Sequence, residues 1–74
     1  GQGVSRLLLI EALSLARSVE DLRQVNLCVN AENAIAIKLY KSFGFVTFGC
    51  ELDSMLVDRK LHNELHMCCR LRES

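Results

Sequence analysis

The 74-residue chain has no proline and no tryptophan, and its formal net charge is zero. Without proline there is no proline-rich linker or polyproline recognition segment. No apolar run is longer than that of Leu7–Ile10, far short of the roughly 18 residues that a membrane-spanning helix needs. The apolar start also lacks the basic segment and small-residue cleavage site of a secretory signal. These absences favour a cytoplasmic globular protein with a single domain over residues 1–74.

The charge balance excludes one class of partner. Nine Lys and Arg residues are matched by nine Asp and Glu residues. Nucleic acids and anionic membranes are held largely by excess positive charge, so neither is expected as a partner. A near-neutral chain also associates with itself more readily, because little charge repulsion keeps copies apart.

The cysteine pattern argues against a conventional metal or redox motif. The four cysteines include the vicinal pair Cys68 and Cys69, and no two of them form a C-x-x-C pair. Free thiols in a reducing cytoplasm are therefore expected. His62 and His66 lie close to the vicinal cysteines in the sequence, but no second pair stands at ligand spacing. No metal site is expected.

Two segments have the pattern of helices. Residues 4–18 carry apolar side chains at helical spacing, with charged and polar side chains opposite. A second, shorter helix is expected in NAIAIKLYKSFG, with Asn33 as its N-cap and Gly44 just beyond its C-terminus. The expected buried face of the first helix consists of Val4, Leu8, Ala12, Leu15, Ala16 and Val19, with Leu9 and Leu13 at its border.

Three segments have the pattern of strands. Residues 25–30 alternate between apolar and other side chains, which places Cys28 on the face opposite the valines. Residues 45–52 are rich in aromatic and β-branched side chains, and residues 64–71 alternate again. Residues 53–63 between them fit a helical turn, a long hairpin loop or a mobile segment. The order helix–strand–helix–strand–strand predicts an α/β or α+β fold with a small sheet.

A glycine-containing start leads directly into the first helix. Backbone N–H groups in the first turn of a helix have no intrahelical acceptor, and the helix dipole is positive there. Together they favour a bound phosphate, and Gly3 allows its close approach. An ordinary helix start with small residues explains this stretch equally well. The predicted donors are the N–H groups of Gln2, Gly3, Val4, Ser5 and Arg6.

Two motifs in order resemble the GCN5-related N-acetyltransferases, the GNAT family. That family carries Gln/Arg-x-x-Gly-x-Gly/Ala at the start of its third helix; Gly3 matches the first glycine, and Ser5 stands where the second small residue belongs. Further along, Asn33, Ala36 and Tyr40 match the pattern Asn-x-x-Ala-x-x-x-Tyr. The resemblance covers nearly the whole chain but only the C-terminal half of the family's fold. It implies a fragment of an acyl-CoA N-acyltransferase fold with a three-stranded, mostly antiparallel sheet.

The resemblance also implies a function, that of the cofactor-binding half of an N-acetyltransferase. The first turn would hold the pyrophosphate of acetyl-CoA, Asn33 would hydrogen-bond the pantetheine arm, and Ala36 would leave room for it. Tyr40 would protonate the departing CoA thiolate, since phenols and thiols have similar acidities. An amine of a small molecule, a protein N-terminus or a lysine would attack the thioester directly, without a metal. Without the resemblance, Asn33 is only an N-cap and Tyr40 only an aromatic residue at the edge of the core.

One position departs from the family pattern. Many members carry a carboxylate general base where this chain has Cys28. A buried cysteine is a poor base, so Cys28 is expected to be a structural thiol. The acetyltransferase hypothesis then needs a general base elsewhere, or a water chain, or none. The chain by itself is expected to be inactive or nearly so.

An interaction module is the alternative from a different class. The resemblance implies that the strand at residues 25–30 pairs on one side only, with the strand at 64–71, and an exposed strand edge recruits partners. Association through this edge, as a homodimer or a larger assembly, follows as an expectation. A nucleotide binder of the Rossmann type is disfavoured, because the third glycine of its fingerprint is missing.

Overall fold

The computed structural model describes residues 2–72, which form two helices and three strands in the predicted order. Helix α1 (Gln2–Ser18) is followed by β1 (Gln24–Asn30), α2 (Ala34–Ser42), β2 (Val46–Val57) and β3 (Lys60–Arg70). Helix α1 begins two residues before the predicted start, so the glycine-containing stretch belongs to its first turn. Neither described helix has the length and apolar character that crossing a membrane requires.

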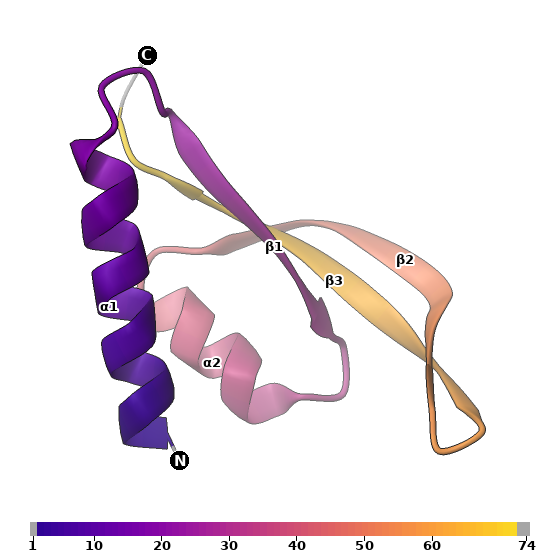
Figure 1. Cartoon of the computed structure of the whole chain (residues 1–74). Coiled ribbons are helices and arrows are strands. Elements are labelled where there is room, and N and C mark those ends of the chain that lie inside the picture. The colour runs from indigo at the N-terminus through magenta and orange to yellow at the C-terminus, as the bar shows by residue number, and fades with distance from the viewer. Residues whose placement is uncertain (1, 73–74) are drawn as a thin grey trace.

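The three strands form one antiparallel sheet in the order β1-β3-β2. This order places the last strand of the chain between the other two, and it confirms the predicted mixed α+β fold with a small antiparallel sheet. Figure 1 shows both helices on the same side of the sheet, with the β2–β3 hairpin extending well beyond them. The sheet therefore has one face covered by helices and one face free of them among the described residues.

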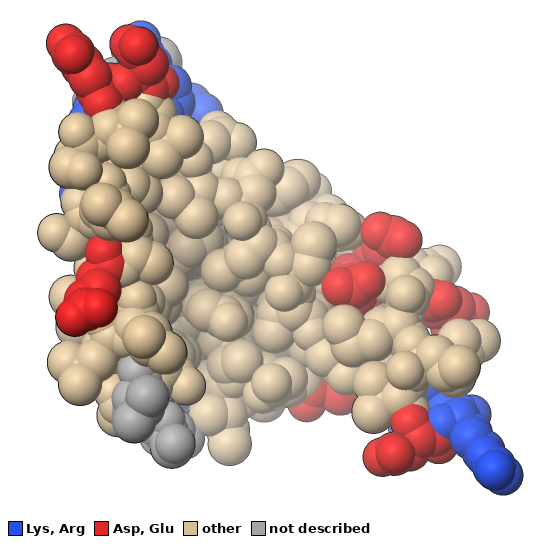
Figure 2. Space-filling view, viewed as in Figure 1, with Lys and Arg blue, Asp and Glu red and all other residues tan. Residues whose placement is uncertain are grey.

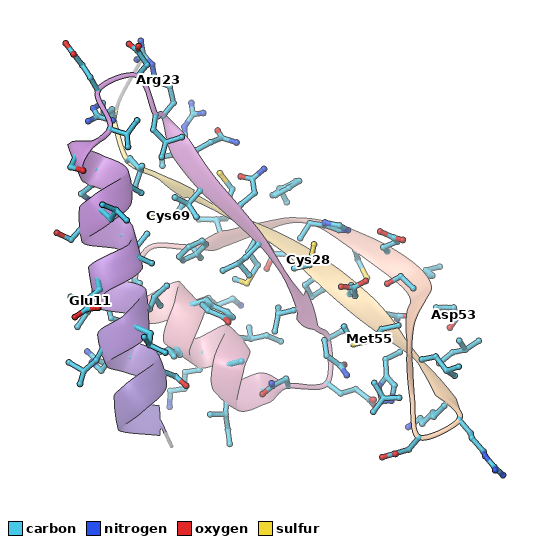
Figure 3. The ribbon with its side chains drawn as sticks, viewed as in Figure 1. Glu11, Arg23, Cys28, Asp53, Met55 and Cys69 are labelled. Atoms are coloured by element: carbon cyan, nitrogen blue, oxygen red, sulfur yellow. The ribbon has the colours of Figure 1, made fainter. Side chains whose placement is uncertain are left out.

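The core lies between the helices and the sheet. Its buried side chains come from α1, β1 and β3, and from Phe45 between α2 and β2. On β1 the valines and Leu27 point to the helices, and Cys28 points away, as the alternation predicts. Figure 3 shows Cys69 in the space between helix and sheet and Cys28 on the sheet beyond it. The buried residues are Leu13, Val29, Phe45, Met67 and Cys69.

The predicted buried face of α1 is wrong by about one residue of rotation. Leu13 is 2% exposed and Leu9 packs against the core beside it. Leu8 and Leu15, which were expected at the centre of the buried face, are 62% and 71% exposed. The helix is apolar around most of its circumference, so its sequence does not distinguish the side that contacts this sheet. The other apolar side faces outward.

Residues 53–63 form the end of a hairpin and match none of the three alternatives. Strands β2 and β3 continue through this segment and are joined by Asp58 and Arg59, which have φ angles of 50° and 65°. Two successive residues with positive φ give the twist that a two-residue hairpin loop needs. Asp53 also has a positive φ, and its N–H donates to Oδ1 of Asn63 at 3.0 Å. This bond bridges an irregularity in the β2–β3 pairing.

The C-terminal end of the described chain is fixed to the end of α1 by Arg72. Its Nη2 donates to the backbone oxygen of Arg17 at 2.6 Å, and its Nη1 donates to that of Leu22. A cation is well placed there, because carbonyl groups at the C-terminus of a helix have no intrahelical partner and carry partial negative charge.

Candidate functional site

A groove of about 870 Å³ runs between the first turn of α1 and helix α2. It is open to solvent, and it joins two segments about thirty residues apart in the sequence. In Figure 2, charged side chains gather mainly at the turn after α1 and at the end of the β2–β3 hairpin, and the surface between them is largely uncharged. The lining residues are Gly3, Ser5, Arg6, Asn33, Ile35, Ala36, Lys38, Leu39, Tyr40 and Ser42.

The structure brings most of the predicted site residues to this one groove. Gly3, Ser5 and Arg6 line it from α1. Asn33, Ala36 and Tyr40 line it from the other side. The remaining two, Gln2 and Val4, lie in the same first turn of α1, and their side chains are outside the described part of the structure. The predicted site residues whose side chains are described thus line one groove.

The N-terminal turn of α1 offers backbone donors to the groove. A helix that begins at Gln2 leaves the first N–H groups without an acceptor, whereas the N–H of Arg6 stands one turn above the Gln2 carbonyl. Arg6 therefore contributes its side chain rather than its N–H. A Cβ added to Gly3 would meet no atom within 4 Å. The backbone at position 3 is therefore open to approach from outside the described chain.

The charged side chains that line the groove are positive, although the chain as a whole has no net charge. Arg6 and Lys38 are among its lining residues, and no Asp or Glu is. The guanidinium of Arg6 lies over the ring of Phe43, 5.1 Å from its centroid. Phe43 is the C-cap of α2, so this contact joins the start of one helix to the end of the other. Lys38 was not among the predicted site residues, because its place in the groove depends on how α2 packs against α1.

Asn33 is the N-cap of α2, as predicted. Its Oδ1 accepts a hydrogen bond from the N–H of Ala36 at 3.1 Å. The backbone oxygen of Asn33 also accepts from the N–H of Ile37 at 3.0 Å. Capping occupies the oxygen of the side-chain amide and leaves its NH₂ group, which donates. Asn33 can therefore cap the helix and donate to a ligand in the groove at the same time.

Tyr40 is half-buried, with its ring held and its hydroxyl free. The ring packs edge-to-face against Phe45, with 5.7 Å between the centroids. Within residues 2–72 no group is hydrogen-bonded to the hydroxyl, and Tyr40 lines the groove. A ring fixed by the core with an unpartnered hydroxyl at a groove fits a proton donor as well as it fits an aromatic residue at the core edge.

Cys28 is exposed, so the expectation of a buried structural thiol is wrong. Its Sγ lies 3.1 Å from Nδ1 of His66, and Nε2 of His66 lies 3.1 Å from Oε1 of Glu51. These three side chains come from β1, β3 and β2 and lie on the sheet face without helices. Sequence reasoning missed this cluster because its members are far apart in the chain. Only the strand pairing brings them together.

Among the described residues 2–72, no three His, Cys, Asp or Glu side chains are placed to share a metal ion. In the cluster just described, the two nitrogens of the imidazole each face a different neighbour, so the thiol and the carboxylate do not converge on one point. The groove between the helices contains cations and amide, hydroxyl and apolar groups instead. Its residues suit an anionic, partly apolar ligand.

Comparison with known proteins gives a consistent result. The sequence profile of the acetyltransferase (GNAT) family matches residues 1–45. No curated protein sequence matches significantly. The ribosomal-protein-S18-alanine N-acetyltransferase from Escherichia coli is similar in structure, with 25% identity and a TM-score of 0.89. The match covers 99% of this chain and 46% of that one.

Two further solved structures are similar at 27% identity. A putative phosphinothricin N-acetyltransferase has a TM-score of 0.88 over 99% of this chain and 44% of its own. The spermidine/spermine N-acetyltransferase from Vibrio cholerae has a TM-score of 0.87 over 96% of this chain and 42% of its own. The chain thus spans less than half the length of each of these three proteins.

Proposed function

The chain belongs to the acetyltransferase (GNAT) family, and on that premise we propose that its groove binds acetyl-CoA for transfer of the acetyl group to an amine. The observation that carries the proposal is the groove itself, which gathers both sequence motifs against one another. A helix N-terminus with unpaired N–H groups and nearby cations suits a pyrophosphate. The acceptor is proposed as an amine of a small molecule, of a protein N-terminus or of a lysine.

The groove offers a position for each part of the cofactor. The pyrophosphate would lie at the first turn of α1, on the N–H groups of Gln2, Gly3, Val4 and Ser5 and beside the Arg6 guanidinium. The pantetheine arm would run along α2, where the Asn33 amide can donate to it and Ala36 leaves space. Both helices are needed, because neither the cation nor the amide alone orients so long a ligand.

Transfer would proceed by direct attack of the amine on the thioester carbonyl. A C–N bond forms, the C–S bond of the thioester breaks, and the CoA thiolate leaves. Tyr40 would donate the proton that the thiolate takes up, since its hydroxyl is free of partners within residues 2–72 and its ring is held against Phe45. No metal is required in this scheme.

Catalysis by these 74 residues alone is not part of the proposal. The chain spans less than half of the enzymes it resembles, so recognition of the amine is proposed to need further structure. Binding of the cofactor is therefore the appropriate readout. The four free cysteines fit a reducing compartment, and we place the protein in the cytoplasm on that ground.

An amide-resolved NMR titration with acetyl-CoA tests the proposal. The amide signals of residues 2–6 and 33–40 should shift together and saturate at one concentration. Pantetheine, which lacks the nucleotide and its phosphates, is the matched control ligand and should shift only the signals of α2. Saturable shifts confined to other elements, or none at millimolar acetyl-CoA, would contradict the assignment of the groove.

A second function is favoured by the free edge of β1. Within the described residues β1 pairs with β3 alone, and its other edge has no neighbour. The outward side of α1 adds Leu8 and Leu15, both mostly exposed. An open strand edge next to an apolar helix surface suits association with a second copy. Sedimentation equilibrium would show a homodimer, and slow amide exchange along β1 in a strict monomer would exclude it.

A further inference from the structure

The helix-free face of the sheet carries a nucleophile, a base and a carboxylate in series. Cys28 Sγ is 3.1 Å from Nδ1 of His66, and the opposite ring nitrogen is 3.1 Å from Oε1 of Glu51. Cys28 and His66 are direct cross-strand partners in the β1–β3 pairing. All three are accessible, since Cys28 is exposed and the side chains of His66 and Glu51 are 31% and 59% exposed. Figure 3 shows Cys28 in the middle of the sheet.

Glu51 determines which way the imidazole faces. An ionised carboxylate only accepts hydrogen bonds, so the nitrogen beside it, Nε2, must carry the hydrogen. In the neutral ring the other nitrogen, Nδ1, is then the acceptor, and it is the one beside the thiol. The thiol can therefore donate its proton to Nδ1, and the carboxylate stabilises the imidazolium that results. This is the orientation that a base needs in order to activate a cysteine.

A bulge in β2 brings Glu51 to this face. Thr47 pairs with Met67 but Gly49 pairs with His66, so Phe48 is one extra residue in β2. Since side chains alternate along a strand, one extra residue exchanges the two faces for everything that follows. Glu51 thereby shares the face of His66. Gly49 lies opposite His66 and has no side chain, so nothing from that position separates the Glu51 carboxylate from the imidazole.

We propose that Cys28 is a nucleophilic thiol that accepts an acyl group from a thioester, with His66 as its base and Glu51 as a positioning residue. The thiol proton moves to Nδ1 of His66, and the thiolate attacks the acyl carbonyl. A new Sγ–C bond forms, the C–S bond of the thioester breaks, and the leaving thiolate takes the proton back from His66. One thioester replaces another, so neither oxidant nor reductant is needed.

This activity goes beyond the proposed function and does not depend on it. The groove lies on the helix side of the sheet, and none of its lining residues belongs to the cluster. The arrangement of nucleophile, base and orienting group is the one with which enzymes of unrelated folds form acyl intermediates. A small thioester without a nucleotide is therefore a sufficient acyl donor, and it probes Cys28 apart from the groove.

The test uses the full chain and the acetyl thioester of N-acetylcysteamine. The rate of acetylation at each cysteine is followed by peptide mass spectrometry, with the exposed Cys50 of β2 as an internal control thiol. We expect Cys28 to be acetylated about tenfold faster than Cys50, or more, because only Cys28 has a base beside it. Equal rates at the two cysteines would overturn the proposal.

Two variants separate activation from folding. His66→Gln should reduce the rate at Cys28 to that of Cys50, and Glu51→Gln should reduce it by about tenfold while keeping a hydrogen-bond acceptor. Glu51 is exposed, so its replacement leaves the core intact. Because both rates come from one molecule, a general loss of structure would change Cys50 as well. An unchanged Cys28 rate in His66→Gln would overturn the role of the base.

Iodoacetamide separates acyl acceptance from simple reactivity. If Cys28 is alkylated faster than Cys50 but gains no acetyl group from the thioester, the acyl-accepting role is wrong. The variant Arg6→Ala is the control for the groove, and its acetylation at Cys28 should match that of the unchanged protein. A failure of acetyl-CoA to bind the groove would leave this result as it is, so the two proposals fail separately.

Discussion

The guanidinium carbon of Arg6 lies 5.1 Å from the centroid of the Phe43 ring, so the N-terminal part of α1 is joined to the C-cap residue of α2. Arg6 shares its side of α1 with Leu9 and Leu13, which pack into the core one and two turns further along. The charge is thus held at the groove by packing on an aromatic face, without a carboxylate to neutralise it. Such a cation remains available to an anionic ligand.

Replacing Arg6 should weaken cofactor binding with little effect on the fold. A hydrogen bond to a charged group contributes about 1.5–3 kcal/mol, so Arg6→Ala should raise the Kd for acetyl-CoA roughly 10- to 100-fold. Isothermal titration calorimetry of each variant with acetyl-CoA measures this Kd. Arg17→Ala is the matched control, because Arg17 lies in the last turn of the same helix and its side chain is exposed. Equal affinities of the two variants would place the phosphates elsewhere.

Gly3→Ala should change stability and binding in opposite directions. A Cβ at position 3 meets open space, and alanine is favoured over glycine in a helix by up to about 1 kcal/mol. The free energy of unfolding in urea should therefore rise slightly. Acetyl-CoA should bind more weakly, because the new methyl group occupies space at the proposed phosphate position. Tighter binding together with higher stability would contradict that position.

Two substitutions at Asn33 distinguish its two roles. Asn33→Ala removes the cap and should lower the free energy of unfolding by about 1 kcal/mol. Asn33→Ser keeps a capping oxygen but loses the amide NH₂, so stability should be nearly unchanged while acetyl-CoA binding weakens. Thermal unfolding measures the stability of each variant, and titration calorimetry measures its affinity for acetyl-CoA. If the serine variant binds as tightly as the unchanged chain, Asn33 is only a cap.

Arg72 should be important for stability, although it is far from both sites. Arg72→Ala removes donors from two backbone oxygens near the end of α1 and should lower the free energy of unfolding by about 1–2 kcal/mol. Arg70→Ala is the control, since that side chain makes one exposed contact with Gln24 and its loss should cost less than about 0.5 kcal/mol. If Arg72→Ala and Arg70→Ala unfold at the same urea concentration, Arg72 is not important for stability.

A loop sequence that favours positive φ angles should stabilise the β2–β3 hairpin. Asp58 and Arg59 both have positive φ, a conformation that Asn-Gly adopts most readily in two-residue hairpin loops. Replacing the pair by Asn-Gly should raise the free energy of unfolding by roughly 0.5–1 kcal/mol, because backbone strain is relieved. Exchange of the amide hydrogens at the ends of β2 and β3 should slow. A destabilised hairpin would indicate that the Asp58 and Arg59 side chains contribute contacts of their own.

Local patterns predicted the elements and the motif residues well. Helices, strands and the N-cap Asn33 follow from short-range spacing, and the pairing of residues 25–30 with the last strand, expected from the family resemblance, is confirmed. The groove residues named from the two motifs are about thirty residues apart, so their grouping was expected from the family resemblance and not from local spacing.

Features that depend on tertiary contacts could not be predicted in this way. The buried side of α1 was misjudged because Leu8 and Leu9 are equally apolar, and only packing against the sheet distinguishes them. The role of Arg72 has no sequence signal, because its carbonyl partners on Arg17 and Leu22 are distant in the chain. The pairing of Cys28 with His66 depends on strand register, which alternation alone does not determine.

The extra residue Phe48 has a consequence for how such a chain can change over generations. Deleting Phe48 would restore regular pairing, with Gly49 still opposite His66 and Glu51 still on the same face. A single insertion or deletion between Gly49 and Glu51 would instead turn the Glu51 side chain to the helix side of the sheet. The arrangement of thiol, imidazole and carboxylate therefore withstands loss of the bulge itself, but not a change in chain length between the bulge and the carboxylate.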